Sequence, residues 1–463
     1  LSFSIGNISL MVDKRWLMIA LLAASLPVQA AQNLLQIYQQ ALARDPVWSA
    51  AQNANRAAQE KIVQGQAQYL PVVSIAGNAN ATSNDVKFVG AGPLPPNQPG
   101  ARRDGRQNYE GYSLGLNIVQ PIFRPQIRAQ LEQAKSMVQQ SDYELAVSKQ
   151  NLILRSSQLY FDVLLAQDKI HLIEAQKQAI SSQLEQARAR FEAGTSTITD
   201  VNEDKARFDL IQAQYIAAVN DLEIKKRALQ ALIGDMPQSL MAVREDLVPQ
   251  TPAPSNIEKW VEMANSANLR IAIQRQALEI AAQEVDRQNA GHLPSLDLVG
   301  SYTDSFVNGG IAGIGLDQRA AVIGMQLSVP IYQGGAVSSR SREALSNKLK
   351  AQDDLEGARR QADMETRQAY LNLVSTVSQI SALEQALAST QSQLESTQLG
   401  YEVGVRTSVD VLNVQQQLFN AKRDLLQARY TYLMNILMLK AAVGDLTMAD
   451  LEAVNQQLVA TNE

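Results

Sequence analysis

The sequence of 463 residues contains no cysteine, few aromatic residues and no excess of basic residues. Without cysteine the chain has no disulfides, thiolate metal ligands or cysteine nucleophiles, and it lacks the residue that carries a lipoprotein's acyl chain. With 41 Lys and Arg residues against 46 Asp and Glu residues, it also lacks the basic surface that nucleic-acid binding requires. Aromatic residues make up only 5%, and alanine and glutamine are abundant, so long helices packed side by side are favoured over a compact globule.

Long apolar runs are also missing beyond Ala30, where no stretch reaches the roughly 18 residues of a membrane-spanning helix. We therefore expect any membrane crossing to be made by strands. At the N-terminus, a basic segment from Met11 to Arg15 precedes an apolar run from Trp16 to Leu26 and small residues up to Ala30. This order predicts a secretory signal peptide cleaved after Ala30 and disfavours a buried N-terminal helix. We assign residues 11–30 to the signal peptide and residues 1–10 to an upstream artefact.

One unit occurs twice in the chain. Gly194 and Gly404 lie 210 residues apart, as do Asp200 and Asp410, and each pair belongs to one short motif with an aromatic residue, a glycine and a T-x-x-D. A glycine followed by a Thr/Asp cap marks the point where one helix ends and another begins, so each motif predicts a turn between helices. The first copy is 14 residues longer between its proline landmarks, which predicts an exposed loop around residues 86–108.

Two kinds of periodicity divide each copy. Segments of about ten residues alternate apolar with small or polar side chains, which is typical of strands that face lipid on one side and also of half-buried strands in a soluble sheet. Apolar residues spaced by three and four then predict antiparallel coiled-coil hairpins that meet at the two turns. The first repeat is predicted over 31–240, with strands at about 71–84 and 109–122 and helices at about 125–194 and 200–234. After a linker or equatorial segment over 241–256, the second repeat spans 257–446, with strands at about 294–304 and 320–331, helices at about 335–404 and 408–444, and a C-terminal tail over 447–463.

The signal peptide, the duplicated order, the L-P and P-I-[FY] strand landmarks and the sequence Y-E-V-G-V-R-T-S-V-D-V-L from Tyr401 to Leu412 resemble the TolC family of outer-membrane exit ducts. The resemblance covers essentially the whole mature chain. It implies a mixed fold, a membrane β-barrel joined to a long α-helical coiled-coil barrel, built from duplicated β-β-α-α repeats. Four strands per chain are too few for a closed membrane barrel, which starts at about eight strands, so several chains must share one. The resemblance accordingly implies a homotrimer with a twelve-stranded barrel and a tapering periplasmic tunnel.

The resemblance further implies a place in outer-membrane lipid and a role in multidrug efflux or type I protein secretion. The implied partners are a periplasmic adaptor protein and an inner-membrane pump of ABC, RND or MFS type. Nucleic acid is not an expected partner, because the chain is mildly acidic.

The resemblance also assigns roles to residues at the two turns. It implies that Asp410 belongs to a ring of carboxylates in the pore, whereas Asn413 stands where the family usually has a second acid. A trimer would then carry three ring carboxylates rather than six, which argues against strong cation block. A ring of like charges raises the pKa values of its members, so acid pH and divalent ions are expected to alter conductance. The implied gate latch comprises Tyr401 and Arg406, bonded to Thr199 and Asp200 on the neighbouring coiled coil, and the implied adaptor-docking tips comprise Gly194, Thr195, Gly404 and Val405.

Local chemistry offers another explanation for the same residues. T-x-x-D is the form of a helix-capping box, so Asp200 and Asp410 are expected to cap helices whether or not they also face a pore. Arg406 by itself would be a solvated charge in a turn. Gly194 and Gly404 are expected first as C-cap glycines.

No residue pattern points to catalysis. His171 and His292 are the only histidines, and neither has a partner at ligand spacing, so no metal, cofactor or general base is expected. Two other classes of protein remain open, a periplasmic coiled-coil adaptor and a secreted enzyme. An adaptor would need one hairpin flanked by small β-domains, whereas this sequence predicts two hairpins, each preceded by a pair of strands.

Overall fold

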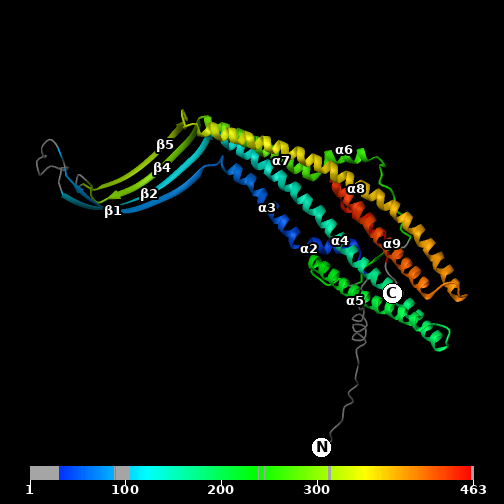
Figure 1. The fold of residues 1–463 in the computed structure, drawn as a ribbon. Helices are drawn as coiled ribbons and strands as arrows, with labels where there is room; N and C mark the ends of the chain where they lie inside the picture. Colours follow the sequence, from blue (N-terminus) through cyan, green and yellow to red (C-terminus); the bar gives the residue numbers. More distant parts are fainter. Residues whose placement is uncertain are drawn as a thin grey trace, which may run out of the picture.

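The structure, a computed structural model, describes residues 31–87, 89, 105–237, 239–244, 246–310 and 314–459. The predicted signal peptide, most of the loop predicted around residues 86–108 and the last four residues lie outside this part of the chain. The molecule is elongated, with a four-stranded sheet at one end and bundled helices at the other (Figure 1).

Two very long helices run along most of the helical part of the molecule. Helix α4 (Pro125–Glu192) has 68 residues and α8 (Ala336–Glu402) has 67, so each extends on the order of 100 Å at about 1.5 Å per residue. The other helices are α2 (Leu34–Arg44), α3 (Pro46–Ala67), α5 (Ile198–Ile233), α6 (Ile257–Ala267), α7 (Leu269–Asn289), the 3-10 turn η1 (Ala290–His292), α9 (Ser408–Val443) and α10 (Met448–Asn455). The strands are β1 (Val72–Val86), β2 (Gly105–Phe123), β3 (Ala242–Val243), β4 (Ser295–Val307), β5 (Leu316–Ser328) and β6 (Leu458–Val459).

The four long strands form one antiparallel sheet in the order β1-β2-β4-β5. Because side chains alternate along a strand, the register brings Ile75, Leu116 and Tyr302 into one row on the same face. Large apolar side chains of the sheet are exposed, and Ile323 on β5 has 79% of its surface open. The edges of the sheet, β1 and β5, are unpaired within the single described chain. A single copy therefore leaves both an apolar face and two strand edges open.

Two helical hairpins run from the sheet end toward the opposite end and back. Helix α5 returns along the far half of α4, and α9 returns along the far half of α8, while α3 and α7 lie beside the halves nearer the sheet (Figure 1). Buried apolar residues at three-four spacing hold the second hairpin together, including Leu394, Val411 and Leu418. The predicted antiparallel hairpins are thus confirmed.

Helix α9 meets the start of α7 end to end. Asn268 caps α7 by accepting the backbone N–H of Arg270, and its side-chain amide donates to the carbonyl of Ala442 at 2.7 Å. Gly444 ends α9 at a φ of +91°, and a Cβ at this position would lie 2.8 Å from the Cα of Asn268. Only glycine fits such a left-handed position pressed against the next helix.

The main core lies at mid-height, where α2, α4, α5 and α9 meet. Tyr160 and Leu433 are fully buried in it, and the Tyr160 hydroxyl donates to the backbone oxygen of Met241 at 2.8 Å. This bond ties the segment between the two repeats to α4.

The C-terminal segment, predicted only as a tail over 447–463, is packed into the same core. Leu451 on α10 is fully buried, and β6 pairs with β3 of the linker through Leu458 and Val243. A further T-x-x-D, from Thr447 to Asp450, caps α10. The heptad pattern ends at Gly444, so only the short cap motif from Thr447 to Asp450 marks the start of this helix in the sequence.

Candidate functional site at the helix tips

Each hairpin turns at a tip that lies at the end of the molecule opposite the sheet (Figure 1). At the second tip, the Thr407 hydroxyl accepts the backbone N–H of Asp410 at 3.2 Å, and the Asp410 carboxylate accepts the backbone N–H of Thr407 at 3.0 Å. The first tip has the same two bonds, at the same distances, between Thr197 and Asp200. Both predicted capping boxes are confirmed, and each satisfies two donors at a helix start that would otherwise lack partners.

The caps also set the charge of the tips. The backbone N–H and hydroxyl of Thr407, together with the nearby charge of Arg406, hold the pKa of Asp410 below its usual value. The backbone N–H of Thr197 and the hydroxyl of Ser196 lower the pKa of Asp200 in the same way. Both carboxylates are therefore ionised at neutral pH. The higher pKa values expected for a ring of carboxylates would require further copies of the chain, because one copy contributes a single Asp410.

The proposed latch residues do not meet within one chain. No hydrogen bond or ion pair in the described structure joins Tyr401 or Arg406 to Thr199 or Asp200. Instead, the guanidinium of Arg190 on α4 lies 4.6 Å from the centre of the Tyr401 ring on α8. This cation–π contact joins the tips of the two hairpins. The latch between neighbouring coiled coils stays a prediction.

Arg406, Asp410 and Asn413 come together along one polar groove beside the second tip, lined also by Gln393 and Gln417. The side-chain oxygen of Asn413 accepts a hydrogen bond from Arg207 of α5 at 3.1 Å. Asn413 is therefore a neutral side chain bound to a cation of the other hairpin. Asn413 adds no negative charge to this groove.

The four predicted docking residues lie at the outermost turns. Gly194 and Gly404 adopt φ values of +78° and +80°, and nothing lies within 4 Å of a Cβ built on either residue. Their backbone conformation, not crowding, requires glycine, as expected of C-caps. Thr195 donates its backbone N–H to the carbonyl of Arg190 at 2.9 Å. Val405 is 75% exposed, so each tip presents a glycine beside an accessible side chain.

Sequence reasoning missed the residues that join the hairpins to each other near the tips. Ile180, Ile211 and Leu412, from α4, α5 and α9, form one buried cluster. Gln176 donates to the side chain of Gln416 at 2.9 Å across the same seam. The three-four spacing predicts an apolar stripe that includes Ile211, but spacing within one helix does not indicate which residues of the other hairpin it faces.

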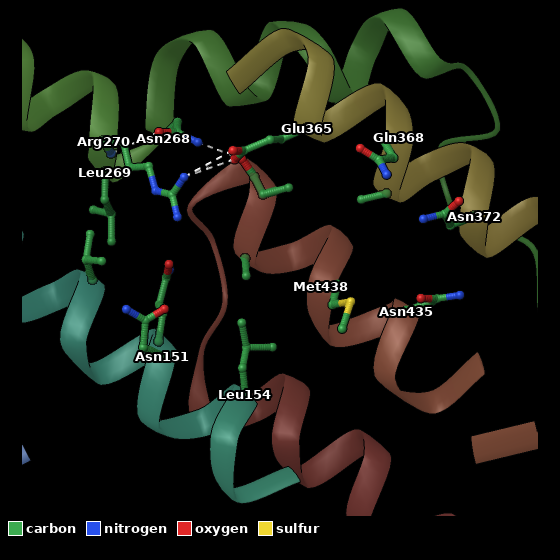
Figure 2. Close-up of a pocket in the computed structure, with 15 residues that line it drawn as sticks. Asn151, Leu154, Asn268, Leu269, Arg270, Glu365, Gln368, Asn372, Asn435 and Met438 are labelled. Carbon is green, nitrogen blue, oxygen red and sulfur yellow. Dashed lines mark hydrogen bonds and ion pairs between the residues drawn. The ribbon is translucent and has the colours of Figure 1, made fainter. Parts of the chain in front are cut away.

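A second cavity lies where α7 meets α9, against α4 and α8, and Figure 2 shows its lining. Arg270 and Glu365 face each other across it in an ion pair with a nitrogen–oxygen distance of 3.1 Å. The other labelled polar side chains are amides, including Asn151 and Asn435. With its two charges paired to each other, this cavity marks the junction of the stacked helices rather than a centre of acid–base chemistry.

His171 and His292 are exposed and lie on different elements. Within the described ranges, no three His, Cys, Asp or Glu side chains are grouped so as to hold a metal ion. None of the described helices combines the length and the apolar character needed to cross a membrane.

The described chain is thus an elongated protein built from a duplicated unit, with one sheet whose large apolar side chains are exposed and two capped helical hairpins whose tips lie at the opposite end. The chain matches the family described as "Outer membrane efflux protein" over residues 37–235 and 260–445, and it belongs to this family. It is an outer-membrane protein.

Relatives span nearly the whole chain. It is 33% identical to "Outer membrane protein TolC" of Escherichia coli over 446 residues, which cover 93% of this chain and 87% of that protein. It is 31% identical to "Outer membrane protein TolC" of Vibrio cholerae over 430 residues, covering 92% and 94% of the two chains. It is 30% identical to "Alkaline protease secretion protein AprF" of Pseudomonas aeruginosa over 434 residues, covering 93% and 88%. The solved outer membrane protein VceC of Vibrio cholerae has the same fold, with a TM-score of 0.73 at 21% identity over 89% of this chain and 96% of that one. The predicted TolC-family membership is confirmed.

Proposed function

We propose that this chain is an outer-membrane exit duct for multidrug efflux, type I protein secretion or both, closed at its periplasmic tips. Relatives named for outer membrane efflux and for protease secretion support both uses. The observation that carries the proposal is the pair of capped acidic tips at the end opposite an exposed apolar sheet. These features suit a channel that crosses the membrane with strands and closes with helices.

The sheet supports assembly as a trimer. Open strand edges are not tolerated in hydrocarbon, because each unpaired backbone N–H or C=O group there costs on the order of several kcal/mol of free energy. One chain leaves the edges β1 and β5 open, and its apolar face is exposed. Three copies joined edge to edge would give one closed twelve-stranded barrel with all edges paired and with lipid against the apolar face.

The tips would then form the gate. In the trimer, Asp410 from each copy would face the pore from the first turn of α9, so one carboxylate would serve both as cap and as pore charge. Tyr401 and Arg406 would bond to Thr199 and Asp200 of the neighbouring coiled coil and hold the aperture closed. Gly194, Thr195, Gly404 and Val405 would receive a periplasmic adaptor that also binds an inner-membrane pump. Residues 11–30 would be removed on export.

The chain would act without catalysis, as a passage for substrates that other proteins select. A periplasmic adaptor fits less well, because both hairpins here follow strand pairs that belong to one sheet.

Membrane fractionation and reconstitution test the proposal. The protein should be recovered in the outer-membrane fraction, require detergent for extraction, run as a trimer and conduct ions in planar bilayers. Recovery as a detergent-free periplasmic protein, or a monomer without conductance, would contradict it.

A further inference from the structure

Asp204, one turn beyond the cap of α5, is buried in the seam between the two hairpins. Its side chain is fully buried, and neither carboxylate oxygen has a hydrogen-bond partner within the described part of the chain. Ile211, seven residues further along the same face of α5, packs against Ile180 of α4 and Leu412 of α9. Asp204 therefore lies two turns closer to the tip in the same three-helix seam.

The neighbours near this level are buried as well. Since α4 runs antiparallel to α5 and α9 runs parallel to it, Leu184 of α4 lies about one turn further from the tip than Asp204, Ala187 of α4 lies level with it, and Ser408, the first residue of α9, also lies about one turn further from the tip. These three residues are 6%, 2% and 1% exposed. The hydroxyl of Ser408 also lacks a hydrogen-bond partner among the described residues. Two adjacent layers of the seam thus each hold a polar side chain without a hydrogen-bond partner among the described residues.

The second copy has no acid at the equivalent position. The counterpart of Asp204, 210 residues later, is Val414, which is 7% exposed and belongs to the apolar core of the second hairpin. The same place in the fold thus accepts an aliphatic side chain in one copy and a carboxyl group in the other. An ionised carboxylate without partners is strongly disfavoured in such a place.

The charges around Asp204 do not offset this cost. Burial and the like charges of Asp200 and Glu203 on its own helix raise the pKa of Asp204 to about 6. Near this level the charged side chains of the facing elements are Glu185 and Arg188 on α4, and Asp410 on α9 with Arg406 just before it. On α5 itself, Lys205 and Arg207 flank the site, and Arg207 bonds to Asn413 instead. No cation bonds to Asp204 in the described structure.

We propose that Asp204 is a proton-binding site that controls how tightly the first hairpin packs at the gate. When protonated, its neutral carboxyl group stays in the seam and α5 remains packed against α4 and α9. When it is ionised, the seam is destabilised and an opened tip, in which the carboxylate reaches water, becomes favoured. The link to gating rests on the proposed function, whereas the proton-dependent packing does not.

The direction and size of the effect follow from linkage. In an opened, hydrated tip the carboxyl group would have a pKa near about 3.9, below its value in the packed tip, so packing takes up a proton. The ratio of open to packed tips therefore rises as pH increases from about 4 to about 6, and it is constant at higher pH. Between pH 4.5 and pH 7.5 the ratio of open to packed tips should rise about 25-fold.

Hydrogen exchange of the purified full-length protein in detergent tests this directly. Protection factors of peptides covering residues 198–211 are compared at pH 4.5 and pH 7.5, after correction for the intrinsic pH dependence of exchange. We expect protection to fall by about 25-fold at the higher pH. Peptides covering residues 425–437 of α9, which are packed in the main core away from this seam, should change little and are the internal reference.

Three variants identify the group responsible. Asp204→Asn and Asp204→Val should both abolish the pH dependence and leave the tip protected at pH 7.5, since the second introduces the residue that the repeat itself uses. Glu203→Gln, an exposed neighbour, is the matched control and should keep most of the response. The proposal would be overturned if the protection factor of the wild type did not change with pH. It would also be overturned if both Asp204 variants kept the pH response of the wild type. Hydrogen exchange does not depend on ion conductance. If protection changes with pH but the protein does not conduct ions, the proposed duct function is contradicted and the proton-dependent packing of Asp204 is not.

Discussion

Two substitutions at the second tip separate the capping role of Asp410 from its proposed role as a pore charge. Asp410→Gln keeps a side chain that reaches back to the backbone N–H of Thr407, because glutamine serves in a capping box at this position, but it removes the charge. Thr407→Ala does the reverse, since it removes the hydroxyl that accepts the N–H of Asp410 and leaves the carboxylate in place.

The expected magnitudes differ clearly. Loss of a threonine N-cap costs about 1 kcal/mol, because one helix-start donor loses its partner. Thr407→Ala should therefore lower local protection at the start of α9 by about fivefold, with cation preference nearly unchanged. Asp410→Gln should cost little stability and reduce the preference for cations over anions in planar bilayers.

The first tip provides the control. Asp200 makes the same pair of capping bonds as Asp410, so Asp200→Gln should match Asp410→Gln in stability while leaving the cation preference largely intact. Reversal potentials in a salt gradient measure the preference, and hydrogen exchange measures the cap. The reasoning is refuted if Thr407→Ala abolishes cation preference while Asp410→Gln preserves it.

Two further predictions concern the latch and the helix junction. Arg406→Ser combined with Tyr401→Phe should raise single-channel conductance in planar bilayers, because it removes the proposed bonds between coiled coils, and an unchanged conductance would leave Arg406 as a surface charge. Gly444→Ala should lower the thermal unfolding midpoint, followed by circular dichroism, more than Gly234→Ala does in the other repeat. Both would place alanine in a left-handed conformation at a cost of about 1–2 kcal/mol, but only at Gly444 does the new Cβ meet backbone, whereas at Gly234 it meets the movable side chain of Arg44. Equal shifts would contradict the tight junction between α9 and α7.

The sequence was sufficient to predict the tips because their chemistry is local. Thr407 and Asp410 are three residues apart, and Gly404 ends the preceding helix through its own φ, so a short motif contains the whole structure of the turn. Thr447 and Asp450 are likewise three residues apart and mark the start of α10 by the same local rule, although no heptad pattern follows them.

Contacts between the two hairpins could not be predicted from such local motifs. The bond from Arg207 to Asn413 and the stacking of Arg190 on Tyr401 join residues more than 200 positions apart, and nothing in either helix specifies its partner. Asp204 was overlooked because an acid on the first turns of a helix is ordinarily an exposed charge that favours the helix dipole. Only the placement of α9 against α4 and α5 shows it to be buried.

Together, the tip carboxylates should respond to acid in two opposite ways. The caps lower the pKa values of Asp200 and Asp410, so their contribution to stability is complete above the unfolded pKa of about 3.9 and is lost as pH falls below it. Asp204, whose pKa is raised to about 6, acts in the opposite sense, because its packing improves as pH falls from about 6 to about 4. Protection of the first tip should therefore pass through a maximum near pH 4, measured as exchange protection of residues 198–211 from pH 3 to pH 7.5. Asp204→Asn should remove only the rise between pH 6 and pH 4, and Thr197→Ala should reduce the loss below pH 4 by weakening the cap. A profile that falls steadily from neutral pH into acid in the wild type would show that the caps alone determine the response of the tip.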